Sequence, residues 1–206
     1  MKRLFYLGVF LLTILSSCKK DNAETLILKA VNVDNIETKA FDKWVYFSFE
    51  KGILGTYTEN EFDYKNSLDW DLAFHRWDVR TNGGESGKGK GAACAVNYQD
   101  LNVELWSLNF ASLAFVNDSK IKTYMAPPDM NAETDADQRK EVPANTILAT
   151  WLKVSMSSIP PTYTMATNAF VIKAANGKMA AIQFTNYLSD KAVKGYVSFK
   201  YIYPLN

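Results

Sequence analysis

The sequence predicts a single-domain, all-β fold that is mostly antiparallel and carries long loops. Apolar and polar residues alternate with a period of two in most strongly patterned segments, as in strands with one buried face. Helical spacing is scarce, and no repeat or linker divides the chain. The alternating segments are residues 43–50, 70–80, 147–156, 169–174, 178–188 and 195–203.

One tight turn predicts the pairing of two of these strands. Residues 169–174 and 178–188 flank Asn176-Gly177, a dipeptide that supplies the positive φ needed in a short hairpin turn. We therefore expect an antiparallel hairpin here. The helix candidates are one turn at the start of residues 66–74 and residues 134–142, which form either a short surface helix or no regular element.

Two irregular segments interrupt the strand pattern. Residues 125–146 are polar, acidic and punctuated by proline, and residues 157–165 ("SSIPPTYTM") follow a predicted strand. Loops as long as the first segment are uncommon inside compact domains and are usually functional or disordered.

The N-terminal residues indicate export and lipidation. Residues 1–17 combine a basic start, an apolar run and small residues, which is typical of a signal peptide and too short to span a membrane. The ending "LSSC" has the form of a lipobox, so we expect cleavage before Cys18 and lipidation of its thiol. An ordinary signal peptide with a chance cysteine is the alternative. Residues 18–25 are then a polar tether, and residues 26–206 form the folded domain.

Composition and cysteine count narrow the classes of function. Once Cys18 is lipidated, Cys94 is the remaining thiol, so the core must stabilise the fold without an intrachain disulfide. Removing Lys2 and Arg3 with the signal peptide leaves 21 of the 23 basic residues, against 22 acidic ones. Because basic and acidic residues are nearly equal in number, the sequence does not indicate a basic face of the kind that binds nucleic acid. Aromatic residues make up 14% of the chain, enough to offer aromatic surface to a ligand.

The glycine-rich loop that follows residue 82 resembles a phosphate-binding loop only in part. Residues 84–90 match G-x-x-x-x-G-K, but Gly91 stands where a Walker A loop has the hydroxyl that binds Mg²⁺. The next residues, "GAACAVNY", favour a strand over a helix. We therefore interpret this loop as a connection between strands.

His75, the single histidine, is interpreted as a scaffold residue. In one continuous strand, His75 and Trp77 share a face, while Arg76, Asp78 and Arg80 alternate on the other as an ion-pair ladder. A lone histidine beside tryptophan is more often a hydrogen-bonded core residue than a ligand.

The residues favour a binding protein over an enzyme. No His/Cys cluster has the spacing of a zinc site, and no G-x-S-x-G motif accompanies the histidine. The carboxylates of Glu133, Asp135 and Asp137 are better explained as a solvated loop face than as a glycosidase pair.

Five methionines follow the signal peptide: Met125, Met130, Met156, Met165 and Met179. Most methionines fill gaps in cores, which suits Met179 in its strand. Met130 lies in "PPDMNAE" with no pattern to bury it, and Met156 ends a strand before "SSIPP". From the residues alone, Met130 is either part of a flexible segment with no particular role or a residue that faces a ligand.

The chain resembles the HmuY-type haem-binding lipoproteins (hemophores) of Gram-negative anaerobes. The passage "WDLAFHRWDVRTNGGESGKGKGAA" carries the strongest resemblance, to "WD-x-A-x-HR-x-DVR-x-N" followed by "GESGKGKG". The segments "WVYFSFEKG", "PPTY", "IQFTNY" and "YIYP" match in order along nearly the whole mature chain, and residues 95–120 match least. The resemblance implies an all-β fold of the HmuY type with long ligand-binding loops.

The resemblance also implies a haem site. The best-known member uses two loop-borne histidines as axial ligands, and the matching positions here are Met130, after "PPD", and Met156, in "VSM" before "SSIPPTY". A thioether favours reduced iron, so ferrous haem is the expected ligand. Lys122, Arg139 and Lys140 are candidate partners of the haem propionates. The expected pocket residues, with Met125 and Met165 also held as reserve ligands, are Tyr124, Met125, Trp151, Ile159, Tyr163 and Met165.

The resemblance further implies a role in iron and haem acquisition. A lipoprotein of this kind takes up haem, in some cases from host haemoproteins, and passes it to a TonB-dependent outer-membrane receptor. Lys19 argues against retention at the inner membrane, so we expect an outer-membrane, surface-exposed protein held by its lipid or released. The main alternative is a carbohydrate-binding or adhesin-type surface lipoprotein. A Cu(I) carrier fits less well, because its methionines would cluster more closely.

Overall fold

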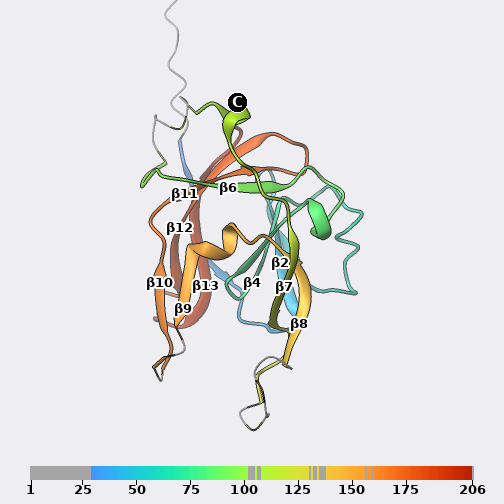
Figure 1. Cartoon of the computed structure of the whole chain (residues 1–206), viewed down its shortest axis with the longest axis vertical. Coiled ribbons are helices and arrows are strands. Elements are labelled where there is room, and N and C mark those ends of the chain that lie inside the picture. The colour runs from blue at the N-terminus through green and yellow to red at the C-terminus, as the bar shows by residue number, and fades with distance from the viewer. Residues whose placement is uncertain are drawn as a thin grey trace, which may run out of the picture.

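The computed structural model describes residues 29–205, apart from residues 102–104, 106–107, 130, 132–133, 135–137, 156 and 159. The fold is all-β and antiparallel, as predicted (Figure 1). A five-stranded sheet has the order β1-β13-β12-β11-β6, and a four-stranded sheet has the order β3-β2-β4-β5. Two further hairpins, β7–β8 and β9–β10, complete the fold. No helix among the described residues is long and apolar enough to cross a membrane.

The five-stranded sheet consists of β1 (Val31–Glu37), β13 (Lys194–Ile202), β12 (Met179–Leu188), β11 (Ala169–Lys173) and β6 (Ala92–Val96). The four-stranded sheet consists of β3 (Gly52–Thr58), β2 (Lys43–Ser48), β4 (Leu72–His75) and β5 (Asp78–Thr81). The hairpins are β7 (Ser119–Tyr124) with β8 (Arg139–Ala144), and β9 (Leu152–Ser155) with β10 (Thr162–Met165). Short 3-10 helices are η1 (Gly84–Ser86), η3 (Phe110–Ser112) and η5 (Leu148–Trp151).

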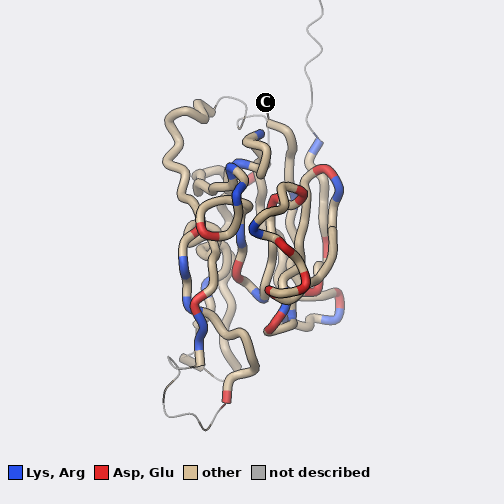
Figure 2. Tube along the Cα trace, turned by 90° about the vertical axis from the view of Figure 1, so that its right-hand side faces the viewer, with Lys and Arg blue, Asp and Glu red and all other residues tan. Residues whose placement is uncertain are grey.

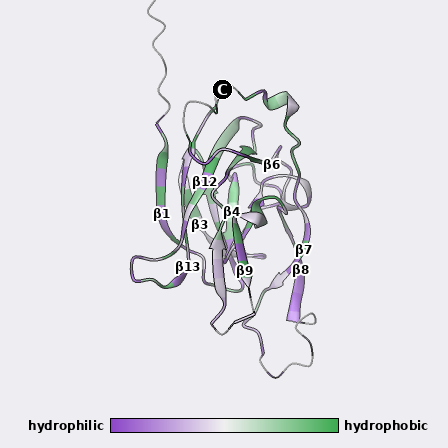
Figure 3. Cartoon of the chain, turned by 60° about the vertical axis from the view of Figure 1, so that its left-hand side comes forward, coloured by the Kyte–Doolittle hydropathy of each residue, from purple (hydrophilic) through white to green (hydrophobic). Residues whose placement is uncertain are grey.

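The central strands are buried on both faces, and alternation decides which core each side chain enters. In β11, Phe170 and Ile172 face the main core between the two sheets, whereas Ala169 and Val171 face a second core beneath the segment that follows β6. Edge-to-face aromatic contacts, such as Phe47 with Phe199 at 5.3 Å between centroids, fill the main core. Hydrophobic residues are accordingly concentrated in the strands of the sheets, while β8 is strongly hydrophilic (Figure 3).

Several sequence-based predictions are confirmed. The segments 43–50, 169–174 and 178–188 contain β2, β11 and β12, and the segment 195–203 overlaps β13, which begins at Lys194. The predicted hairpin joins β11 to β12, and its positive φ is at Gly177 (+89°). The segment after the glycine loop is a strand, β6, as expected.

Residues 70–80 are not one strand, so the predicted faces are wrong. The chain turns at Arg76 and Trp77 between β4 and β5, and Arg76 adopts a φ of +53°. Phe74 pairs with Val79 across the turn and both side chains enter the main core, although continuous alternation had placed them on opposite faces. Because the turn contains neither glycine nor asparagine, it could not be predicted from the sequence.

Other boundaries also differ from the prediction. Residues 147–156 begin with the 3-10 helix η5, and strand β9 follows it. At the start of residues 66–74 the chain completes a turn, in which Ser67 N–H donates a hydrogen bond to Asp63 O. Of the two alternatives for residues 134–142, the helix does not form from Arg139 onward, because β8 pairs there with β7. The two irregular segments are thus shortened by β8 and β10. Strands β1, β3, β7, β8 and β10 were not predicted.

Candidate ligand-binding cavity

A cavity of about 260 Å³ lies between the β7–β8 hairpin and the segment formed by η5 and β9. The β7–β8 and β9–β10 hairpins extend toward the same end of the molecule, opposite the C-terminus (Figure 1). We call this space the hairpin cavity. It is lined by Trp77, Asp78, Lys122, Thr123, Tyr124, Arg139, Ala149, Leu152 and Val154.

The hairpin cavity combines an apolar wall with a basic edge. Trp77, Leu152 and Val154 provide apolar surface, while Lys122 and Arg139 contribute positive charge from the paired strands β7 and β8. The Arg139 guanidinium lies 4.9 Å from the centroid of the Tyr124 ring. Binding cavities for small molecules pair apolar walls with a few polar groups and commonly measure 300–1,000 Å³, so the hairpin cavity has the usual chemistry but is slightly smaller than this range. This arrangement suits a largely apolar ligand that carries anionic groups.

Aromatic side chains of the main core pack against the apolar wall of the hairpin cavity. The Tyr187 ring packs against Trp77, Trp151 and Tyr163, with centroids 6.4, 5.8 and 5.5 Å away. Burial raises the pKa of Tyr187 above its ordinary value, although the positive charge of Arg76 acts in the opposite direction. Tyr187 therefore remains a neutral phenol and a rigid support.

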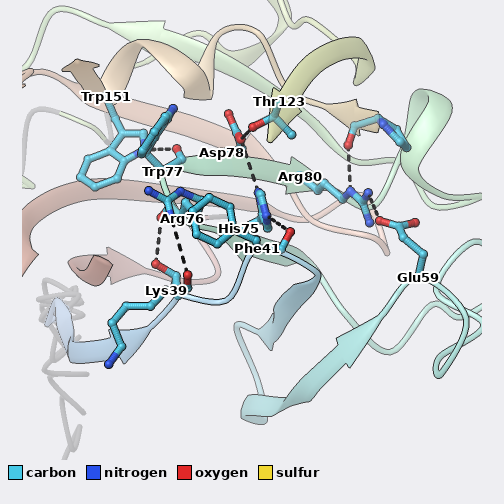
Figure 4. Close-up of polar contacts among 12 residues, drawn as sticks. Lys39, Phe41, Glu59, His75, Arg76, Trp77, Asp78, Arg80, Thr123 and Trp151 are labelled. Carbon is cyan, nitrogen blue, oxygen red and sulfur yellow. Dashed lines mark hydrogen bonds and ion pairs between the residues drawn. The ribbon is translucent and has the colours of Figure 1, made fainter. Parts of the chain in front are cut away.

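Two residues that line the hairpin cavity, Asp78 and Thr123, contact each other and His75 through polar atoms (Figure 4). Thr123 Oγ1 donates a hydrogen bond of 2.6 Å to Asp78 Oδ2, which joins β7 to β5. His75 Nδ1 lies 3.5 Å from the same Asp78 oxygen, and His75 Nε2 is 2.8 Å from the Phe41 carbonyl oxygen. His75 is completely buried and stacks on Trp44, which agrees with its predicted scaffold role.

The ion-pair ladder predicted for Arg76, Asp78 and Arg80 forms only in part, because among the described residues Arg80 alone of the three pairs with a carboxylate of a neighbouring segment, that of Glu59 after β3. Arg80 is buried, donates to Glu59 Oε1 at 2.5 Å and lies 3.7 Å from the centroid of Trp44. The Arg76 guanidinium instead lies over the rings of Phe41 and Trp77. Asp78 and Arg80 lie two residues apart on β5, whereas Arg76 lies in the turn that precedes this strand.

The predicted axial ligands Met130 and Met156 lie outside the described residues, as do Ile159 and Cys18. Their roles stay predictions. The described neighbours place the two loops: one connects β7 to β8, and the other connects β9 to β10. Tyr124, at the end of β7, lines the hairpin cavity, as do the predicted propionate partners Lys122 and Arg139.

The remaining predicted pocket residues lie elsewhere. Trp151 is fully buried, stacks on Phe184 at 4.4 Å and donates its indole N–H to Trp77 O, so it supports the wall from the core. Tyr163 and Met165 lie on β10 and pack against the same main core. Met125 packs against the cluster around Trp44 and Tyr46 on the other side of the β7–β8 hairpin. None of these four lines the hairpin cavity.

A second hollow of about 550 Å³ lies on that other side. Met125 and Lys140 line it, together with side chains of both charges such as Lys120 and Glu141, whose charged atoms are 4.0 Å apart. Across the described chain, basic and acidic residues are similarly interspersed (Figure 2). Neither hollow is a basic surface of the kind that nucleic acid requires.

Sequence reasoning missed Trp77, Asp78, Thr123, Leu152 and Val154 as cavity residues. Trp77 and Asp78 reach the cavity through the unpredicted β4–β5 turn. Thr123 lies on β7, which was not predicted as a strand. The signal that could have located Leu152 and Val154 is their position just before the second irregular segment.

The glycine loop is a structural connection, in agreement with its interpretation from the sequence. Gly84 has a φ of +59°, and a Cβ there would lie 2.4 Å from the Asp118 carbonyl oxygen, so no other residue fits without movement. Asp118 itself accepts hydrogen bonds from Ser86 Oγ in this loop and from Thr81 Oγ1, both at 2.6 Å. No group of three His, Cys, Asp or Glu side chains that could hold a metal ion occurs among the described residues.

Comparison with known families identifies the fold. The family described as HmuY protein matches residues 40–201, which is most of the chain. The chain belongs to the HmuY family. No curated protein matches it.

Solved structures agree with this HmuY assignment. A structure described as a HmuY-like haem-binding protein from Bacteroides vulgatus has 28% sequence identity and a TM-score of 0.67, over 86% of this chain and 93% of that one. A structure described as a lipoprotein from Bacteroides fragilis has 27% identity and a TM-score of 0.68, over 86% and 92% of the two chains. The apo HmuY analogue of Tannerella forsythia (22% identity, TM-score 0.59, 85% and 97% covered) shares the fold.

Proposed function

We propose that this protein is a haem-binding surface lipoprotein that captures haem beside the hairpin cavity, with Met130 and Met156 as axial ligands. The observation that carries the proposal is a cavity with an apolar wall and the basic side chains of Lys122 and Arg139, between the two hairpins whose loops contain these methionines. Membership of the HmuY family and the similarity to a HmuY-like haem-binding protein support it. The protein acts as a carrier and not as an enzyme.

The chemistry of the cavity suits haem as cargo. A porphyrin is flat and largely apolar, and its two propionates are anionic. Trp77, Leu152 and Val154 offer apolar surface for the ring, while Lys122 and Arg139 offer cations for the carboxylates. Thioether ligands are soft and bind without losing a proton, so they favour ferrous iron and give no direct pH dependence to ligation.

The position of the start of the described chain relative to the two hairpins supports a role at the cell surface. The described chain begins near the C-terminus, and the two hairpins extend toward the opposite end (Figures 1 and 3). A lipid on Cys18 would therefore anchor the end away from the hairpin cavity. In this proposal the cavity faces outward from the outer membrane, takes up haem, including haem from host haemoproteins, and passes it to a TonB-dependent receptor.

Haem titration tests the proposal directly. We expect ferrous haem to bind more tightly than ferric haem, and binding to persist at acid pH, since no ligating imidazole has to stay unprotonated. At a hundredfold excess of free haem over Kd, linkage contributes about 2.7 kcal/mol. The Tm should then rise by roughly 5–11 °C in a domain of this size. Absence of both a haem spectrum and a Tm shift would favour the carbohydrate-binding or adhesin alternative, whereas equal ferric and ferrous affinity would overturn the redox preference.

A charge reversal on β7 tests the position of the propionates. Lys122→Glu should weaken haem binding by about three- to tenfold at low ionic strength and less in high salt, because this lysine is exposed at the edge of the hairpin cavity. Lys120→Glu is the matched control, since Lys120 lies on the same strand but lines the second hollow. Equal losses in the two variants, measured by haem titration, would show that the propionates do not use this edge.

A further inference from the structure

The β9–β10 hairpin supplies part of the cavity wall, yet it belongs to neither of the two larger sheets. Its strands form a two-stranded sheet, in which each pairs only with the other among the described strands. Leu152 and Val154 of β9 line the hairpin cavity. The positions of these two side chains therefore depend on the contacts that hold the hairpin against the rest of the molecule.

Strand pairing places two residues of β10 directly beside the two wall residues. Met165 pairs with Leu152, and Tyr163 pairs with Val154. Directly opposed residues of an antiparallel pair project to the same face, and all four of these side chains belong to the main core or pack against it. Tyr163 does not line the hairpin cavity, but it is the direct neighbour of the wall residue Val154.

The base of the hairpin is fixed by the core. Leu152 is 3% exposed, and the preceding residue, Trp151, stacks on Phe184 of β12. Further along the hairpin, Val154 and Tyr163 are only partly buried. Contacts at the level of Tyr163 therefore control how closely the outer half of the hairpin approaches the five-stranded sheet.

Two strands of the five-stranded sheet contact Tyr163 (Figure 1). The Tyr187 ring of β12 has its centroid 5.5 Å from that of Tyr163, and Lys194 Nζ of β13 lies 4.3 Å from the Tyr163 centroid. The same ammonium group donates a hydrogen bond of 3.3 Å to Pro161 O, two residues before Tyr163. A cation within about 6 Å of a ring centroid is attracted by the ring face. Lys194 thus contacts both the ring and the backbone of one short segment.

We infer that Tyr163 and Lys194 form a brace that positions the β9–β10 hairpin and, through it, Val154 in the wall of the hairpin cavity. Neither residue lines the cavity, so both are positioning residues. The brace itself does not depend on haem, whereas its effect on haem rests on the proposed function. In that function a loosened wall packs less closely on the porphyrin, so the haem dissociates faster.

Hydrogen exchange in the ligand-free protein tests the brace. Lys194→Met removes the charge and keeps an unbranched side chain. We expect the backbone amides of β10 to exchange about two- to fivefold faster, as the loss of one exposed cation–π contact allows, while those of β12 keep their rates. Lys194→Arg keeps a cation that can lie over the ring and donate to Pro161 O, so it should exchange like the wild type. Unchanged β10 exchange in Lys194→Met would overturn the inference.

A double-mutant cycle separates the brace from a general loss of stability. Tyr163→Leu should also speed exchange in β10, but adding Lys194→Met to it should have much less effect than in the wild type, because the aromatic partner is gone. Fully additive effects would contradict the brace.

Lys191→Met is the matched control for the loss of a lysine. Lys191 lies in the turn between β12 and β13, and its side chain makes no ion pair or ring contact among the residues that the structure describes. This variant should exchange like the wild type. If it sped β10 exchange as much as Lys194→Met, the effect would come from charge in general and not from the brace.

Haem release tests the coupling of the brace to the cavity. Transfer of haem from the loaded protein to an excess of apomyoglobin measures the dissociation rate. This rate should rise about two- to fivefold in Lys194→Met and stay at the wild-type value in Lys194→Arg. Unchanged release together with faster β10 exchange would refute the coupling. If the wild type binds no haem, the proposed function fails, while the exchange rates still show whether the brace exists.

Discussion

Replacing Met130 and Met156 together by alanine is expected to abolish specific haem binding. Each thioether supplies one axial bond in the proposed site, and alanine supplies none. Either single variant should keep one ligand and shift the Soret band. The double variant should leave only weak association with the apolar wall of the hairpin cavity. Absorption spectra recorded during titration with dithionite-reduced haem distinguish these outcomes.

Met179→Leu is the control for the loss of a methionine. Met179 lies in β12, packs against the second core and is remote in sequence from both loops. Leucine has a similar volume, so the fold and the spectrum should be unchanged. If the double variant kept the wild-type band, the assignment of Met130 and Met156 would be wrong, and Met125 and Met165 would become the next candidates.

The strands that the sequence predicted well share a physical property. In β11 and the first half of β12, side chains alternate between the main core and the second core, so most positions are apolar and the Asn176-Gly177 turn stands out between the two strands. The β4–β5 hairpin has no such signal. Its positive-φ residue is Arg76, whose N–H donates to Thr38 O and whose guanidinium stacks over Phe41. Those contacts join residues that are far apart in the sequence, so no local pattern predicts the turn.

The same limit applies to the ligand cavity. Lys122, Tyr124 and Arg139 were predicted from their closeness to a long loop, and the structure brings all three to the hairpin cavity. Trp77 and Asp78 were assigned to a strand face because the turn beside them was not predicted. Closeness to a loop in the sequence was therefore only a partial guide, because Trp151, Tyr163 and Met165 also flank the loops and do not line the hairpin cavity. Residues brought to the cavity by tertiary folding were missed.

Asp118→Ala is expected to lower the free energy of unfolding by about 3–5 kcal/mol, because it leaves several buried donors without an acceptor. Asp118 is 4% exposed. Its carboxylate accepts from Thr81 N–H and Thr81 Oγ1 at 2.8 and 2.6 Å, from Ser86 Oγ at 2.6 Å and from Asn145 Nδ2 at 2.9 Å. Burial raises the pKa of Asp118, and these donors act in the opposite direction. Urea denaturation of the ligand-free protein measures the loss.

Removing the Asp118 carboxylate should loosen both the glycine loop and η5, which lies beside the hairpin cavity. Asn145 Oδ1 accepts the backbone N–H groups of Ile147 and Leu148, so Asp118 holds the residue that caps the start of η5. Asp69→Ala is the control, because Asp69 pairs with Lys51 on the exposed surface and its removal should change stability little. If Asp118→Ala unfolded at the same urea concentration as Asp69→Ala, the glycine loop would have to be held by other contacts, and its interpretation as a fixed scaffold connection would fail.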